Sequence, residues 1–127
     1  MVATSNGNII IFDPETAKEI KQANPISIVE SEESIGSKHF RVTQMIISDD
    51  GLFCATSDST RAVSLFKKSK TYDQEDKQVE WWFLGKHRTH SREITSICFG
   101  HSLDENNQIK HRLFSIGKDR RIFEYDT

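Results

Sequence analysis

The sequence predicts an all-β chain built from repeated antiparallel sheets, and three observations support this fold class. Two short runs, 42–47 and 94–99, are rich in β-branched residues and carry apolar residues at their first, fourth and sixth positions, which favours strands over helices. Polar turns separate such runs. Three times, a polar turn leads into a strand that ends on an aromatic residue, at Phe12, Phe66 and Tyr125, which indicates internal repetition.

The first unit, residues 1–41, is expected to contain the end of one sheet followed by a linker. Residues 3–13 combine a strand end, a polar turn and a strand finishing at Phe12. A further strand is weakly marked near residues 18–22. We expect at most one turn of helix, within residues 26–38, because no segment combines a sustained helical period with capping residues.

The middle unit, residues 42–86, is expected to form a complete four-stranded meander. A turn ending at Gly51 connects its first two strands, and Phe66 ends the third. Trp81 and Trp82 lie in the fourth strand and therefore point to opposite faces. We favour packing of both between neighbouring sheets over exposure at the sheet edge. The four predicted strands are 42–47, 52–56, the strand that ends at Phe66, and 79–84.

The third unit, residues 87–127, is expected to supply three strands of the next sheet. The first of these is 94–99, and a polar turn at 117–120 separates the other two. The last strand ends at Tyr125, so this unit repeats the strand order of the middle unit as far as its third strand.

Composition argues against several partners. The chain has 17 Lys and Arg against 19 Asp and Glu, a formal net charge of −2, so no nucleic acid or anionic membrane partner is expected. Its apolar runs are far shorter than the roughly 20 residues that span a bilayer. Cys54 and Cys98 each lie in an apolar run, which predicts reduced thiols in the core of a soluble, intracellular protein.

The third unit resembles the WD-repeat family of β-propellers. In that family a His before the first strand, a Ser or Thr on the second, an Asp in the next turn and a Trp on the third form a hydrogen-bonded set. The matching positions are His90, Ser115, Asp119 and Tyr125. The resemblance implies a partial β-propeller of about two four-stranded antiparallel blades, a fragment whose remaining blades come from other sequence. Because propellers need about four to eight blades, we expect the isolated chain to aggregate or stay unfolded.

The match departs from the family pattern in several places. Tyr125 replaces the Trp whose indole N–H would donate to Ser115, so the set is either incomplete or completed by the phenol or water. In the middle unit Lys38 and Thr60 stand at the His and Asp positions, and in the first unit Asn6 stands at the Asp position.

A narrower resemblance concerns the runs 55–66, 84–90 and 115–126, which are similar to those of cilia- and flagella-associated WD-repeat proteins of the calmodulin- and spoke-associated complex. This resemblance implies a non-catalytic scaffold of the ciliary or flagellar axoneme, near the base of the radial spoke, with spoke and doublet-microtubule proteins as partners. A WD-repeat adaptor of a ubiquitin ligase or chromatin complex is the alternative with the same fold.

Two chemical alternatives use the same residues and are disfavoured. His87 and His90 form one close pair, but a zinc site needs three or four converging ligands, so no metal or cofactor is expected. His90, Asp119 and Ser115 are the residue types of a hydrolase triad. Ser115 is nevertheless expected on a strand rather than on a strained turn, and no Gly-rich oxyanion loop accompanies it. We therefore expect no enzyme activity.

The length of the repeat predicts inserted loops. The aromatic positions are 54 (66 − 12) and 59 (125 − 66) residues apart, more than the roughly 40 to 45 residues of a typical WD repeat. Up-and-down strand order places the insertions at 67–78 and 100–111 on one face, and the segments 23–40 and 86–92 on the other. Loops on rigid scaffolds carry binding function, so we expect a protein-contact face at 67–78 and 100–111. The candidate contact residues are Trp82, His101, Asp104, Glu105, Lys110, Lys68, Lys70 and Tyr72.

Overall fold

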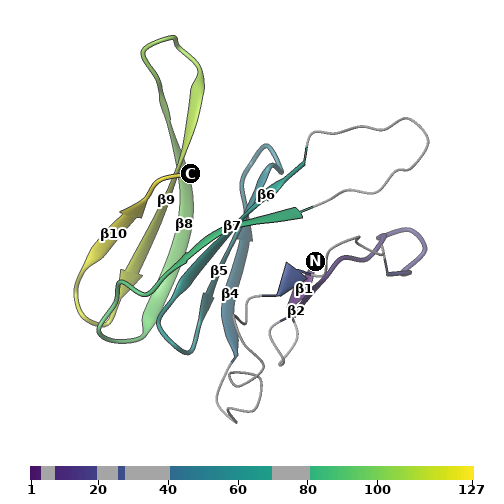
Figure 1. The fold of residues 1–127 in the computed structure, drawn as a ribbon, viewed down its shortest axis with the longest axis horizontal. Helices are drawn as coiled ribbons and strands as arrows, with labels where there is room; N and C mark the ends of the chain where they lie inside the picture. The colour runs from purple at the N-terminus through teal and green to yellow at the C-terminus, as the bar shows by residue number, and fades with distance from the viewer. Residues whose placement is uncertain (4–7, 20–25, 28–40, 70–80) are drawn as a thin grey trace.

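The computed structural model describes residues 1–3, 8–19, 26–27, 41–69 and 81–127. Within these ranges every helix-or-strand element is a strand, so the predicted all-β class is confirmed there. The strands form three antiparallel sheets that follow one another along the chain (Figure 1). Their bounds are β1 (Val2–Ala3), β2 (Asn8–Ile10), β3 (Ile26–Ser27), β4 (Val42–Ile47), β5 (Phe53–Asp58), β6 (Val63–Lys68), β7 (Trp81–His87), β8 (Ile94–Leu103), β9 (Ile109–Gly117) and β10 (Ile122–Tyr125).

The middle sheet has the order β4-β5-β6-β7, and each strand is antiparallel to the next. Ser48 fixes the turn between β4 and β5, because its hydroxyl accepts the backbone N–H of Phe53 at 2.9 Å. Gly51 completes the turn with a φ of 69°, a left-handed conformation that glycine adopts without a steric penalty. The sequence therefore determines this meander locally, through turn chemistry and strand-forming runs.

The third sheet has the order β10-β9-β8 and differs from prediction in the segment 100–111. This segment was expected to be a loop, but β8 and β9 continue their pairing through it as far as Leu103 and Ile109. Asp104 makes the extension possible, because its Oδ1 accepts the backbone N–H groups of Asn106 and Gln108, both at 2.8 Å. The result is a long hairpin that projects beyond the rest of the sheet (Figure 1).

The first sheet has the order β1-β2-β3, so the strand that pairs with β2 is Ile26–Ser27 and not the predicted segment 18–22. Glu19 forms only an isolated bridge with Phe12. A tight turn explains this, because Asp13 accepts the N–H of Ala17 at 2.8 Å and donates its own N–H to the Lys18 carbonyl. Residues 20–22, and the part of the expected helical turn beyond residue 27, lie outside the described residues.

The core consists of two apolar clusters on opposite faces of the middle sheet. One face carries Phe53, Ala55, Val63 and Leu65, which pack against the third sheet. The other face contributes Cys54, Phe66 and Trp81, which pack against Ile9 of the first sheet. Each large apolar side chain buried in this way contributes roughly 1.5–3 kcal/mol. The three sheets are therefore stacked face to face, with the middle sheet between the other two.

The second and third sheets use equivalent positions for this stacking. Phe66 pairs with Cys54, and Tyr125 pairs with Leu113. Each of these four residues lies on the face turned toward the preceding sheet. Phe12, the corresponding aromatic of the first unit, is 40% exposed, so the aromatic position is buried in two of the three repeats.

Two residues that were expected to be buried are exposed. Trp81 is buried as predicted, but Trp82, on the opposite face of β7, is 53% exposed. Cys98 is also exposed, whereas Cys54 is buried. Cys98 pairs with Phe114 on the face of the third sheet that points away from the middle sheet. Burial raises the pKa of the Cys54 thiol to about 12.

Candidate functional site

His90, Ser115, Asp119 and Tyr125 lie together beside the β9–β10 turn and form a connected hydrogen-bond network. The imidazole Nδ1 of His90 is 3.0 Å from both carboxylate oxygens of Asp119. Its Nε2 is 2.6 Å from Ser115 Oγ, and Ser115 Oγ is 2.8 Å from the Tyr125 hydroxyl. The Tyr125 hydroxyl is in turn 2.7 Å from Thr89 Oγ1. The Tyr125 phenol therefore completes the hydrogen-bonded set through Ser115.

One orientation of protons satisfies every group in this network. Thr89 donates to the Tyr125 hydroxyl, Tyr125 donates to Ser115, and Ser115 donates to Nε2 of His90. Nδ1 of His90 then donates to Asp119. Because His90 and Ser115 are buried, leaving any of these groups without a partner would cost roughly 1–3 kcal/mol. The network is therefore a strong constraint on how the loop before β8 sits on β9.

Asp119 binds His90 and also holds its own turn in place. Burial opposes ionisation of its carboxyl group, but hydrogen bonds from His90 and from the backbone N–H groups of Ser91 and Arg121 outweigh burial and lower the pKa to about 2. The carboxylate form is therefore held over the whole physiological pH range.

Gly117 and Phe123 complete the surroundings of His90, and neither residue was predicted to belong to this site. A Cβ at Gly117 would lie 2.4 Å from Nδ1 of His90 and 2.8 Å from Oδ1 of Asp119, so no larger side chain fits there. The ring of Phe123 meets the imidazole edge-on at 4.8 Å. The signal available in the sequence was the position of Gly117 midway between Ser115 and Asp119.

The arrangement of Ser115, His90 and Asp119 has the connectivity of a hydrolase triad, but Ser115 is placed differently from a nucleophile. Its side chain is fully buried, with an exposed fraction of 0%. Its hydroxyl also bonds to Tyr125. A catalytic serine must reach a substrate carbonyl beside oxyanion donors. The geometry of this network is therefore suited to holding strands together.

The middle sheet fills the corresponding place with a different pair. Asp58, at the position of Gly117, lies 3.3 Å from the ammonium group of Lys86, and both side chains are largely buried. Asp58 Oδ1 also accepts the hydroxyl and the backbone N–H of Thr60, at 2.6 and 2.7 Å. Thr60 therefore binds within its own turn, as a supporting residue for Asp58. Lys38, the residue predicted at the His position, lies outside the described residues.

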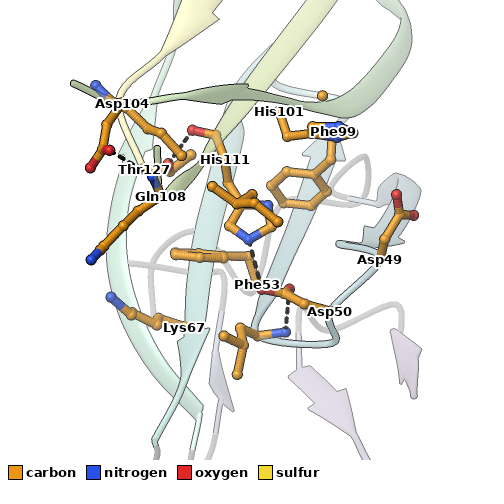
Figure 2. A pocket seen from close by; sticks show the side chains of 14 residues that line it. Asp49, Asp50, Phe53, Lys67, Phe99, His101, Asp104, Gln108, His111 and Thr127 are labelled. Carbon is orange, nitrogen blue, oxygen red and sulfur yellow. Dashed lines mark hydrogen bonds and ion pairs between the residues drawn. The ribbon is translucent and has the colours of Figure 1, made fainter. Parts of the chain in front are cut away.

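A cavity of about 500 Å³ lies between the β4–β5 turn and the projecting β8–β9 hairpin (Figure 2). Its floor is aromatic, with the rings of Phe53 and His111 5.2 Å apart. His111 Nε2 is 2.6 Å from Oδ2 of Asp50 and so connects the hairpin to the middle sheet. Burial opposes ionisation of Asp50, but hydrogen bonds from Ser48, from a backbone N–H and from His111 lower its pKa. Lys67 borders the cavity with its ammonium group 5.2 Å from the centre of the Phe53 ring.

The predicted contact residues divide between this cavity and other places. His101, Asp104 and Lys110 border the cavity. Glu105 is exposed at the tip of the hairpin turn. The remaining candidates are elsewhere: Trp82 is exposed on β7, Lys68 is half-buried at the end of β6, and Lys70 and Tyr72 lie outside the described residues. Lys67, Asp50 and His111 border the cavity and were not among the candidates.

The described residues give no geometry for a metal site or a membrane span. Among them, no three His, Cys, Asp or Glu side chains are grouped in a way that would hold a metal ion. Within the same ranges, the structure contains no helix with the length and apolar character needed to cross a bilayer.

Comparison with known proteins adds a cellular context. No protein-family model matches the chain. Cilia- and flagella-associated protein 251 of Tetrahymena thermophila is 42% identical over 127 residues, which is 99% of this chain and 12% of that protein. The chain is similar to cilia- and flagella-associated proteins. The proteins of the same name from Pongo abelii and Mus musculus are each 32% identical over 97 residues, 76% of this chain, and the chain spans 8% and 7% of their lengths.

Proposed function

We propose that this chain is part of a WD-repeat β-propeller that acts as a non-catalytic protein-interaction scaffold in cilia or flagella. We place it in the axoneme near the base of the radial spoke, with spoke and doublet-microtubule proteins as its partners. Balanced charge supports partners that are proteins rather than nucleic acids or membranes. The observation that carries the scaffold function is the buried network of His90, Ser115, Asp119 and Tyr125, which joins strands and keeps the Ser115 hydroxyl out of reach of a substrate.

The stacking of the sheets supports the propeller. In the middle sheet Val63 pairs with Ser57 on the face that the third sheet covers. In the third sheet Ile122 pairs with Ile116 in the same register. These two isoleucines are 67% and 42% exposed. The third sheet therefore carries an exposed apolar face at the position where the middle sheet is covered by its neighbour. This face supports a further sheet packed against the third sheet, as expected for a blade within a larger ring.

The similarity to ciliary proteins supports the location. Relatives from a ciliate and from two mammals carry names that associate them with cilia and flagella. The similarity to the ciliate protein covers 99% of this chain, so it extends over the sequence of all three sheets.

Localisation of the full-length protein tests this proposal. The protein carrying a fluorescent tag should be retained in axonemes after detergent removes the ciliary membrane. If Ser115→Ala destabilises the blade, the amount of this variant in axonemes should be lower than that of the natural protein. Hydrolytic activity should not differ between the variant and the natural protein. Enrichment of the natural protein in nuclei or with ubiquitin ligases, and absence from axonemes, would favour an adaptor of another complex.

A further inference from the structure

Three connections between strands bring basic side chains together at one end of the sheets. They are residues 58–61, where β5 passes to β6, residues 86–93, where β7 passes to β8, and residues 117–121, where β9 passes to β10. They lie at the end opposite the projecting hairpin (Figure 1). The Arg61 guanidinium donates to the Ser91 carbonyl at 2.6 Å, and the Ser91 N–H donates to Asp119 at 3.0 Å. Hydrogen bonds thus join all three connections into one surface, which is termed the basic face.

The charge of the basic face differs in sign from that of the rest of the chain. Its three segments contain seven Lys and Arg against three Asp and Glu, a net charge of +4 (7 − 3) with His counted as neutral. The whole chain has −2, so the remaining residues carry −6 (−2 − 4). A short acidic segment matches this distribution, whereas a long polyanion such as a nucleic acid would extend onto surface of its own sign.

The acidic side chains of the basic face are already used within it. Asp58 and Asp119 have side chains only 1% and 4% exposed, and both bond inside the protein. Glu93 pairs with Lys118. By contrast, the arginines of the face are all exposed, and they are Arg61, Arg88, Arg92, Arg120 and Arg121. None of them forms an ion pair with another described residue, so the outward charge of the face is positive.

Two of these arginines have a backbone conformation that disfavours their residue type. Arg61 and Arg120 occupy the same position of equivalent turns, where each N–H donates to the carbonyl three residues earlier, and their φ angles are 68° and 62°. The hairpin turn 104–108 has the same hydrogen bonds but carries Asn107 at this position, and asparagine tolerates the left-handed conformation better than arginine does. The Arg120 side chain makes no hydrogen bond to a described residue. Strain that serves no contact within the fold is typical of binding sites.

We propose that the basic face binds an acidic, Glu- or Asp-rich segment of a partner protein, whose carboxylates pair with Arg88, Arg92 and Arg120. Guanidinium groups suit this role because each can donate two parallel hydrogen bonds to one carboxylate. This inference names the class of partner for the proposed scaffold, and it rests on that function only in taking the partner to be a protein.

Peptide binding to the full-length protein tests the proposal. The probe is a fluorescent octa-glutamate peptide, followed by fluorescence anisotropy at a fixed ionic strength. Arg120→Gly removes one charge and places a residue that adopts a positive φ without penalty, so the turn should stay folded while the affinity falls by about threefold. Asn107→Gly, the same change at the equivalent position of the hairpin turn, is the matched control and should leave the affinity unchanged.

The place of binding supplies the second arm. Arg88→Gln and Arg92→Gln combined with Arg120→Gly should weaken the octa-glutamate peptide by at least about tenfold. A benzophenone group on the peptide should crosslink to residues 86–93 or 117–121, as identified by mass spectrometry. An octa-lysine peptide is the control for the sign of the charge and should not crosslink there.

The remaining occupants of the face are separated by two further measurements. Glu30, Glu32 and Glu33 form an acidic run in the same chain, and their replacement by Gln should leave the peptide affinity unchanged. A gain in affinity would assign the face to this run instead of a partner. An oligothymidylate of eight nucleotides should bind more weakly than the peptide, and tighter binding that Arg120→Gly weakens would assign the face to nucleic acid.

Two other results would also overturn the proposal. One is a peptide that does not saturate or that crosslinks only elsewhere, and the other is equal binding by Arg120→Gly and Asn107→Gly. None of these results would alter the outcome of the localisation experiment, so the two proposals fail independently.

Discussion

Gln44 and Ile97 join the first strands of two successive sheets. Oε1 of Gln44 accepts the backbone N–H of Ile97 at 2.9 Å, and Nε2 of Gln44 donates to the Thr95 carbonyl at 2.8 Å. A single amide side chain on β4 thus satisfies two backbone groups on β8 and fixes the distance between the sheets. Arg61 adds a second connection through the Ser91 carbonyl at 2.6 Å. The sheets are therefore held together by directed bonds as well as by apolar packing.

Replacement of Gln44 tests this connection. Gln44→Ala removes both bonds and leaves the Ile97 N–H without a partner, which should reduce the local free energy of opening by about 1–2 kcal/mol. Hydrogen exchange of the Ile97 amide in the full-length protein measures this change. Gln108→Ala, at an exposed residue of the hairpin turn, is the control and should leave exchange at Ile97 unchanged. Unaltered protection in Gln44→Ala would show that apolar packing alone joins the sheets.

Gly117 provides a steric test of the buried network. In Gly117→Ala the new methyl group would overlap Nδ1 of His90, so the side chains must shift and the third sheet should lose about 1–3 kcal/mol of stability. Thermal unfolding and hydrogen exchange of β9 amides report the loss. In Gly85→Ala the methyl group has only an ordinary contact, 3.7 Å from Nε2 of His87, so this variant should be close to the natural protein. Equal stability of the two variants would contradict the geometry of the network.

Ser115 provides the corresponding hydrogen-bond test. Ser115→Ala leaves Nε2 of His90 and the Tyr125 hydroxyl short of a partner in a buried site, which should cost about 1–3 kcal/mol. Ser102→Ala, in the projecting part of β8, is the control. If Ser115→Ala were as stable as the control, the network would be dispensable for the fold, and Ser115 would have no structural role.

The lowered pKa of Asp119 predicts how the stability of the folded protein depends on pH. Its folded-state pKa of about 2 lies below the ordinary value of 3.8, so the unfolded chain binds a proton more readily than the folded chain. The stabilisation from this group is therefore complete above about pH 4 and is lost as the pH falls toward about 2. Asp119→Asn removes that titration, so the difference in stability between the natural protein and this variant should shrink over the same interval. Acid unfolding curves measure it, and a constant difference would contradict the assignment.

Local patterns explain which features could be predicted from the sequence. The meander from β4 to β7 could be predicted because Ser48, Gly51 and the β-branched runs act within a few residues of one another. The sequence placed His90, Ser115 and Asp119 in one set through a family resemblance, and the structure brings their side chains within hydrogen-bond distance.

Other features depend on contacts that no local pattern reveals. The polar segment 100–111 resembles a loop by composition, but the capping bonds of Asp104 allow the hairpin to continue through it. The ion pair of Asp58 on β5 and Lys86 on β7 crosses the intervening strand β6, whose pairing with β7 includes a bulge. The exposure of Cys98 depends on which face of the third sheet is covered, and an apolar run cannot distinguish the two faces of a strand.

A density map of the full-length protein tests whether these sheets are consecutive blades. If they are, a further antiparallel sheet packs about 10 Å from the face of the third sheet that carries Ile116 and Ile122, and Cys98 is buried between the two sheets. A map in which that face is open to solvent, or is covered by helices, would exclude this arrangement.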